Sequence, residues 1–465
     1  MKRLFVALLA MCCGLGVAGP AHAQTAPAWN VTGSGHRDYR VSGSGEPGGS
    51  KGATVTLDAS KASSGAFGAS AAVLDAAPYR GHGLTLSAVL ATLDATSGAG
   101  IWLRADDRAG KAIAFANSMR TPVSGTASNV SREIRIIVPA TAARLVLGTI
   151  LAGNGEVTAS HLRLAVAPAP VTTADPEAVL DAAIRIVREH ALRARDVDWK
   201  RLEPSLHAMA HGAKAPADVY PAIRLLLAAL GDHHSLLMEP WQASHERDSG
   251  NPTSSFVVRL QAGGIGYVKM PGYMGMDAKA RHAFANGVVG AMKRIAPQAR
   301  CGWIVDLRQD TGGNMYPMLA GLRPLLGSRP LGSFRDAGGH RQSFAAPGAG
   351  KPWPDAPALE HAPVAVLLGA HTASSGEAVA VAFRGRPDTR SFGMPTAGLS
   401  TANAGFGLPD GSEIFLTTAI DVDRAGHAYG GKLQPDVRVP DAAGRHDAAL
   451  AAAMAWLRHR RNCDD

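Results

Sequence analysis

The sequence predicts an α/β core with a small helical subdomain, preceded by an all-β domain. Three regions with different residue patterns along the 465 residues support this prediction. Up to about residue 166, short alternating runs lie between Gly- and Ser-rich turns, and from 177 to 240 the apolar period becomes about 3.6. Beyond 240, short apolar strands alternate with helical stretches, which is typical of a largely parallel sheet.

The first 23 residues have the pattern of a secretory signal peptide. Lys2 and Arg3 precede the apolar run 4–10, and residues 21–23 fit an Ala-x-Ala cleavage site. The sequence therefore predicts an exported protein, periplasmic or secreted and of bacterial type, whose mature chain begins at Gln24. No later apolar run is long enough to span a bilayer, so we expect no membrane span.

Charge and cysteine content narrow the class of protein further. The net charge of +9 comes from scattered basic residues, so we expect no nucleic-acid partner. Of the 4 cysteines, two lie in the predicted signal, which leaves Cys301 and Cys463. An exported protein permits one disulfide between these two, and the sequence leaves open whether it forms.

Residues 24–166 are predicted to form a jelly-roll-like β-sandwich that serves as an accessory domain. Alternating runs at 54–57, 101–103 and 134–138 are separated by turn residues. The region resembles jelly-roll modules of the carbohydrate-binding type, which implies a carbohydrate or another docking partner. An exposed Trp102 could stack on a sugar, although a tryptophan in an alternating strand more often belongs to the core.

A proline-containing segment at 167–176 is predicted to be a linker, so the all-β domain should fold separately. Residues 177–240 follow as a helical subdomain, in which apolar residues recur at helical spacing. Gly231 ends its last helix, and two histidines stand beside an acid and a hydroxyl at 232–235.

Residues 241–445 are predicted to form the α/β core, and 446–465 a C-terminal helix and tail. The expected strands are 265–270, 303–307, 364–368 and 414–418, and the expected helices are 277–295, 315–325 and 375–382.

Ser374 and Ser375 lie where the strand 364–368 turns into a helix. At such a turn their hydroxyls can cap the helix, and an anion would meet free backbone N–H groups. Taken alone, the turn is a serine N-cap in which Glu377 completes a capping box.

Separated segments resemble the tail-specific, or C-terminal processing, serine peptidases. Residues 306–313 are similar to the family signature Asp-Leu-Arg-x-Asn-x-Gly-Gly, and 372–377 resemble the family's nucleophile turn. Its closing segment is matched by 408–411, 417–418 and 434–436. The resemblance extends from about residue 174 to 440. It implies a crotonase-like ββα spiral and a serine-type peptidase that needs no cofactor.

Within that family, the chain resembles the branch of the tricorn core and the interphotoreceptor retinoid-binding protein more than the Ser-Lys branch. Ser-Lys enzymes carry a lysine after a Gly-x-x-Thr-x-Gly turn, whereas here residues 393–398 are followed by Leu399. A serine hydroxyl needs a base, and without the lysine that base must be a histidine. His234 matches the place of the histidine in the tricorn-like branch, and His233 is the alternative.

The resemblance also implies the remaining parts of a serine-peptidase site. Ser374 would be the nucleophile, and the oxyanion would be held by a backbone N–H of Gly312 or Gly313 together with that of Ser375. Ser235 is the candidate group that orients the histidine, and the acidic member of the catalytic set is unresolved. Glu377 is expected to be structural.

Two other function classes compete with a peptidase. Asp232, His233 and His234 could bind a metal, but adjacent histidines point apart and no third spaced ligand is apparent, so no metal is expected. A non-catalytic peptide- or ligand-binding protein on the same fold is the main alternative, since the lysine position is empty.

The family often inserts a PDZ module between its helical subdomain and its core. The interval between Ser235 and Ile265 is too short for such a module. We therefore expect the substrates to be peptides, or flexible segments of proteins, that reach the cleft directly.

Overall fold

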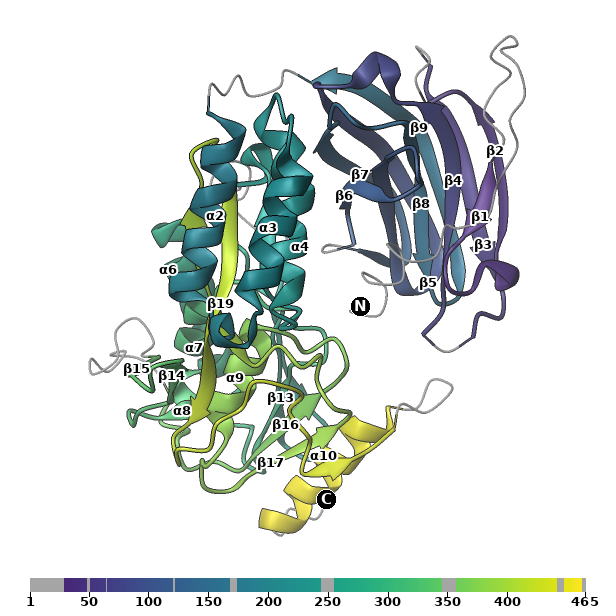
Figure 1. The fold of residues 1–465 in the computed structure, drawn as a ribbon. Helices are drawn as coiled ribbons and strands as arrows, with labels where there is room; N and C mark the ends of the chain where they lie inside the picture. Colours follow the sequence, from purple (N-terminus) through teal and green to yellow (C-terminus); the bar gives the residue numbers. More distant parts are fainter. Residues whose placement is uncertain are drawn as a thin grey trace.

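The computed structural model describes residues 29–47, 51–63, 65–119, 122–167, 174–243, 255–344, 357–440 and 447–461. The predicted signal peptide, residues 168–173 of the predicted linker and Cys463 lie outside these ranges. Cys301 is disulfide-bonded. Figure 1 shows a β-rich N-terminal domain beside a group of helices, with an α/β region below the helices.

The N-terminal domain contains one hydrogen-bonded sheet of nine strands. Its strands are β1 (Asn30–Thr32), β2 (Arg40–Gly45), β3 (Ala53–Ala59), β4 (Phe67–Asp75), β5 (Gly83–Asp106), β6 (Ala112–Asn117), β7 (Val123–Ile137), β8 (Arg144–Ala152) and β9 (Gly155–Ala167). The order is β1-β4-β8-β5-β9-β3-β2, and β6 and β7 also pair with β5.

The 24-residue strand β5 connects the whole sheet. Its first half pairs with β9 and its second half with β8, so one strand contributes to both layers of the curved sheet. The prediction of a β-rich N-terminal domain is therefore confirmed. Trp102 on β5 is buried, and its indole N–H donates a 2.9 Å hydrogen bond to the Ser70 carbonyl, so it belongs to the core and offers no open face to a sugar.

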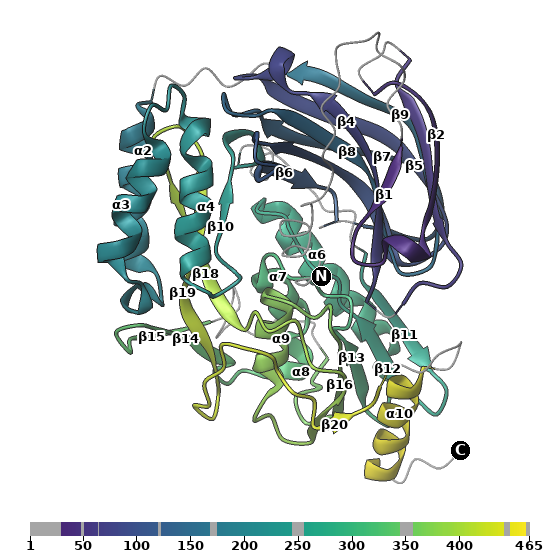
Figure 2. The same ribbon diagram turned by 45° about the vertical axis from the view of Figure 1, so that its right-hand side comes forward.

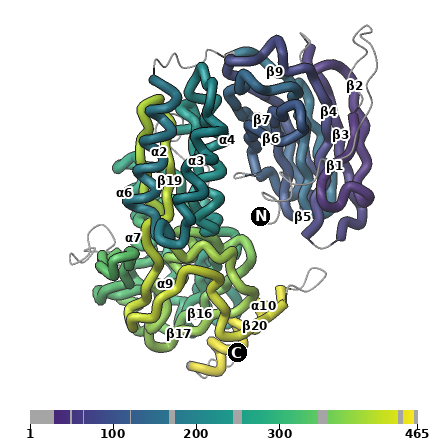
Figure 3. The backbone as a smooth tube through the Cα atoms, viewed as in Figure 1, coloured from purple at the N-terminus to yellow at the C-terminus, as the bar shows by residue number. Residues whose placement is uncertain are grey.

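The helical subdomain consists of α2 (Pro176–His190), α3 (Trp199–Ala210) and α4 (Tyr220–Ala229). Asp175 caps α2 by accepting from the Glu177 N–H, and Pro176 takes the first helical position, where its missing N–H costs nothing. The apolar faces of these helices pack together and against Ile414 and Leu416 of β19 (Glu413–Asp423). Figure 3 shows the tube of β19 rising from the α/β region along the helices.

The α/β core is built on a six-stranded sheet with the order β11-β12-β13-β16-β17-β20. These strands are β11 (Val257–Gln261), β12 (Ile265–Lys269), β13 (Trp303–Asp306), β16 (Val364–Leu368), β17 (Thr389–Gly393) and β20 (Val437–Arg438). The strands from β12 to β20 are parallel, and only β11 runs antiparallel to its neighbour. The predicted parallel core is confirmed for the expected strands 265–270, 303–307 and 364–368. The expected strand 414–418 instead lies in β19, which pairs antiparallel in a second sheet.

Helices cover both faces of this sheet because successive strand side chains point to opposite sides. Trp303 and Val305 pack against α6 (Ala278–Ile295), α7 (Met315–Gly321) and α9 (Ser375–Phe383), with α8 (Arg323–Leu326) beside them. Ile304 packs on the other face against α10 (Ala448–Arg461). Within the described ranges, no helix is long and apolar enough to cross a membrane.

A second sheet joins the helical subdomain to the core. Strands β10 (Leu236–Met238), β19, β14 (Gly332–Asp336) and β15 (Arg341–Ser343) follow in that order, and β18 (Thr401–Gly407) also pairs with β19. Strand β10 begins two residues after His234, and β18 begins at Thr401. The pairing of both strands with β19 therefore sets the positions of these two residues.

The N-terminal domain, which lies beside the helical subdomain in both views (Figure 2), is hydrogen-bonded to both members of an ion pair on the helical side. Glu239 follows β10 and accepts from Arg224 of α4 at 2.8 Å and from the backbone N–H of Ile137 at 3.1 Å. Arg224 also donates to the carbonyl of Ile113 on β6. Burial raises the pKa of Glu239, while Arg224 opposes that shift. The β domain therefore contacts the helices through specific hydrogen bonds.

Candidate active site

Ser374 occupies a sharp turn between β16 and α9. Its backbone has φ +54° and ψ −120°, a conformation that non-glycine residues rarely adopt and that costs about 1–3 kcal/mol. Such strain is maintained where a side chain must be presented at a fixed angle, as on a strand-to-helix turn that exposes a nucleophile. The hydroxyl of Ser374 therefore projects from a rigid position at the start of a buried helix.

His234 lies opposite this hydroxyl. Its Nε2 is 3.0 Å from Ser374 Oγ, although the two residues are 140 positions apart in the sequence. His234 is mostly buried, with 9% of the residue exposed, whereas Ser374 is partly exposed. The structure thus brings together the serine and the histidine that the sequence analysis singled out.

The other ring nitrogen of His234 contacts Thr401. Nδ1 lies 2.6 Å from Thr401 Oγ1 at the start of β18. Ser235, the candidate orienting group, is placed elsewhere, because its hydroxyl donates to the Asp232 carboxylate at 2.6 Å and accepts from the Thr417 N–H at 3.0 Å. A threonine hydroxyl on a distant strand thus takes the position that the sequence analysis considered for Ser235.

The loop that carries His234 is fixed by short-range hydrogen bonds. The Asp232 carboxylate accepts from the backbone N–H groups of His234 and Ser235, each at 2.9 Å. Asn403 of β18 donates to the His234 carbonyl at 2.8 Å. Asp232 and the hydroxyl of Ser235 therefore stabilise the turn of this loop.

Glu377 connects the Ser374 turn to the segment before β18. Its carboxylate accepts from the backbone N–H groups of Ser374 at 3.0 Å, Gly398 at 2.9 Å and Leu399 at 2.6 Å, and from the Thr396 hydroxyl. Burial raises the pKa of Glu377, while these donors oppose the shift. The predicted structural part of Glu377 agrees with these contacts.

The Gly312-Gly313 pair comes directly beside the serine turn. A Cβ on Gly312, whose φ is +103°, would lie 2.8 Å from the Ser374 Cβ. A Cβ on Gly313, whose φ is +108°, would overlap the Tyr273 carbonyl. Only glycine permits so close an approach at these dihedrals. Backbone N–H groups of this loop therefore lie beside the candidate nucleophile.

The two glycines differ in what their N–H groups do. The N–H of Gly312 donates to Asp310 Oδ1 at 3.0 Å. Within the described residues, the N–H groups of Gly313 and Ser375 have no recorded acceptor. The Ser375 hydroxyl donates to the Gly313 carbonyl and holds the loop against α9. Of the predicted donors, Gly313 and Ser375 are thus the two that are open to a ligand.

Residues 264–439, which include this turn and this glycine pair, match the family model described as Peptidase family S41. This region therefore belongs to peptidase family S41. The core is that of a serine-type peptidase.

Relatives of known sequence and structure extend the comparison beyond the S41 core. The chain is 26% identical over 294 residues to a nisin-resistance protein of Lactococcus lactis subsp. lactis, covering 61% of this chain and 87% of the relative. A lipoprotein from Streptococcus agalactiae has 24% identity and a TM-score of 0.54, covering 63% of this chain and all of that one. A photosystem II D1 C-terminal processing protease has 16% identity and a TM-score of 0.44, over 58% and 94% of the two chains.

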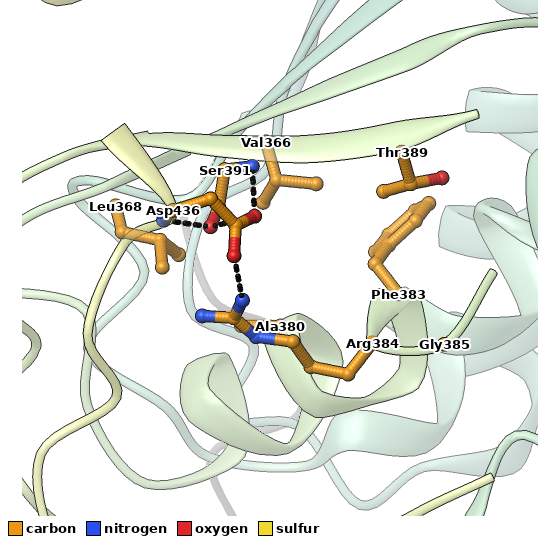
Figure 4. A pocket seen from close by; sticks show the side chains of 9 residues that line it. All are labelled: Val366, Leu368, Ala380, Phe383, Arg384, Gly385, Thr389, Ser391 and Asp436. Carbon is orange, nitrogen blue, oxygen red and sulfur yellow. Dashed lines mark hydrogen bonds and ion pairs between the residues drawn. The ribbon is translucent and has the colours of Figure 1, made fainter. Parts of the chain in front are cut away.

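A pocket at the opposite end of α9 is lined in part by an ion pair of the S41 core. Arg384 donates to Asp436 at 2.8 Å, and Asp436 also accepts from the Ser391 hydroxyl and N–H (Figure 4). The 434–436 segment, which resembles the family's closing segment, thus attaches the last strand to the C-terminal end of α9. This pocket is distinct from the site at Ser374, which lies at the N-terminal end of the helix.

Proposed function

We propose that the protein hydrolyses peptide bonds through an acyl-enzyme on Ser374, with His234 as the base. The observation that supports this most directly is the 3.0 Å contact between His234 Nε2 and Ser374 Oγ across the sequence. That distance is within the range required of a general base and its nucleophile. A strained serine that faces an imidazole favours nucleophilic catalysis over ligand binding alone.

In the first half-reaction, Ser374 Oγ attacks the scissile carbonyl while its proton passes to His234 Nε2. Before the attack, the neutral imidazole carries its proton on Nδ1, which donates to Thr401 Oγ1. Nε2 is then unprotonated and can accept the proton of Ser374. The negative charge on the carbonyl oxygen is stabilised by the N–H groups of Gly313 and Ser375. His234 then gives the proton to the leaving amine as the carbon–nitrogen bond breaks, and the acyl-enzyme remains.

Water completes the second half-reaction by the reverse use of the same groups. His234 takes a proton from the water as its oxygen attacks the acyl carbon, and the same two N–H groups hold the second oxyanion. The bond to Ser374 Oγ then breaks, and Oγ recovers the proton from His234 as the carboxylic acid leaves. No group outside this set is required to balance the protons.

A serine-directed phosphonate probe tests this assignment. We expect mass spectrometry to find the label on Ser374 of the mature protein and to find none after Ser374→Ala. Labelling after His234→Ala should fall to background, because the hydroxyl then has no base. Labelling of Ser375 or Ser235 would refute the nucleophile, and folded protein that neither labels nor cleaves a broad peptide library would favour the ligand-binding alternative.

The substrate is proposed to be a peptide or an extended protein segment that reaches Ser374 without a PDZ module. Two exposed methionines border the proposed oxyanion donors: Met274 is 37% exposed and Met276 is 61% exposed. The Met274 sulfur lies 2.8 Å from where a Cβ on Gly313 would be. Methionine suits an adaptable apolar surface, so we propose that bulky apolar side chains bind there.

Met274→Glu is expected to raise KM about tenfold for peptides with a bulky apolar residue beside the scissile bond. Placing a carboxylate against an apolar side chain should cost roughly 1.4 kcal/mol of binding, which corresponds to that factor. Steady-state kinetics on matched peptides measures the change. Met209→Glu is the control, because Met209 is 38% exposed but lies on α3. An equal rise in KM for both variants would contradict an apolar subsite at Met274.

Export and the N-terminal domain complete the proposal. The signal-like first 23 residues support export to the periplasm or the medium. The β-rich domain is proposed to be an accessory domain that docks a carbohydrate or another partner. Because Trp102 is buried, such a partner would have to contact other side chains.

A further inference from the structure

Asp310 lies between the two segments that carry the proposed oxyanion donors. It follows β13, and its carbonyl accepts from the Ala373 N–H at 2.9 Å. A Cβ added to Gly376, in the first turn of α9, would lie 2.8 Å from the Asp310 Cγ. The whole residue is buried. Its carboxyl group therefore sits directly behind the glycine loop and the start of α9.

The two oxygens of this carboxyl group have unequal surroundings. Oδ1 accepts from the Gly312 N–H at 3.0 Å. Oδ2 is buried and has no hydrogen-bond partner within the described residues. Burial raises the pKa of Asp310 to about 8, and the Gly312 N–H only partly opposes this. This shift favours the neutral acid at neutral pH.

Among the described residues, no charged or titratable side chain is paired with the Asp310 carboxyl. Arg308 is two residues earlier and donates to two other aspartates. Glu377 on α9 is occupied by its four donors. His371 lies on the turn before α9, and His234 faces Ser374. In the described structure, the one recorded partner of the Asp310 carboxyl is a backbone N–H, so no cation stabilises its ionised form.

We propose that Asp310 is a positioning residue that supports catalysis only as the neutral acid, and that its ionisation switches the peptidase off at alkaline pH. An ionised Asp310 would place a negative charge behind the Gly312-Gly313 loop, where the reaction itself creates a second negative charge. In a buried site, where water screens little, two like charges repel more strongly than in water. This inference rests on the proposed mechanism, because it assumes that the oxyanion forms at these donors.

The pH dependence of kcat/KM for Asp310→Asn tests this inference. Asparagine keeps the acceptor oxygen for the Gly312 N–H but cannot ionise. For the wild type, we expect kcat/KM at pH 9 to be about tenfold below its plateau, because roughly one molecule in eleven would keep the neutral acid. For Asp310→Asn, we expect the plateau to extend through pH 9. A parallel alkaline fall in both proteins would overturn the inference, as would a wild type without such a fall.

Asp421→Asn is the matched control. Asp421 on β19 is also buried, and neither of its oxygens has a hydrogen-bond partner among the described residues. Burial and the negative charge of Glu377 raise its pKa to about 8. It is not bonded to the glycine loop, so Asp421→Asn should keep the alkaline fall of the wild type. If Asp421→Asn removes the fall instead, the switch is not at Asp310.

Folding must be measured beside activity. A carboxyl group whose pKa is higher in the folded than in the unfolded state lowers stability as the pH rises between those two values. Circular dichroism at pH 9 therefore has to show that the wild type stays folded while it loses activity. If Asp310→Asn does not fold, the rate of phosphonate labelling of wild-type Ser374 between pH 7 and pH 9 decides, and an unchanged rate would overturn the inference. Wild type that neither cleaves nor labels at any pH would instead refute the proposed function.

Discussion

Replacing Ser374 with alanine is expected to lower kcat by about 10⁵- to 10⁶-fold while the fold is retained. The substitution removes only the hydroxyl group. Without the nucleophile, a serine peptidase retains only the weak catalysis that substrate binding and the oxyanion donors supply. Because the residual rate comes from those other groups, KM for a peptide substrate should change little. Steady-state assays with a fluorogenic peptide measure kcat and KM.

Ser375→Ala is the matched control for this experiment. It deletes the neighbouring hydroxyl, which donates to the Gly313 carbonyl, but keeps the backbone N–H that is proposed to hold the oxyanion. We expect a loss of no more than about tenfold, since one hydrogen bond that positions the loop is weakened. Equal losses in the two variants would mean that the serine nucleophile has been misassigned.

Replacing His234 with alanine is expected to lower kcat by about 10⁴- to 10⁶-fold. Without the imidazole, no base takes the proton of Ser374 and no acid returns it to the leaving amine. Residues that act as one unit are strongly non-additive, so the double variant with Ser374→Ala should be no slower than the worse single variant. The wild type should gain activity from mildly acidic to neutral pH, because an ordinary imidazole titrates near 6.5.

His233→Ala tests whether the effect belongs to His234 alone. His233 has φ +58° and stands next to the proposed base, but the recorded contact with Ser374 comes from His234. We expect His233→Ala to keep kcat within about tenfold, since alanine is only moderately strained at that dihedral. A loss as large as that of His234→Ala would transfer the proposed base to the other histidine.

The parts of the fold that the sequence predicted are those with local signals. The helix 277–295 appears as α6 with Asp277 as its N-cap, and the turn at Ser374 appears where small residues follow the apolar strand 364–368. Each of these depends on residues within one or two turns of each other. The histidine was placed by resemblance to a family, which carries long-range information that spacing alone does not.

Thr401 was missed because no local pattern marks it. It is 167 residues from His234, and its position depends on the pairing of β18 with β19. Ser235 was considered instead because it is adjacent in sequence, but adjacent residues in a turn point in different directions. Likewise, nothing in the sequence indicated that Gly312 would give its N–H to Asp310, since the bond depends on how the loop closes.

The ion pair between Glu239 and Arg224 has a consequence for recombination between related genes. Glu239 is separated from His234 only by Ser235 and the three residues of β10, and it accepts the N–H of Ile137 from the other domain. Exchanging the N-terminal domain for one without that N–H would leave a buried carboxylate short of a donor, which costs about 1–3 kcal/mol or more. The loop could then relieve that cost by shifting β10, and with it the histidine. A domain that looks detachable along the sequence is therefore constrained to evolve together with the site it does not contain.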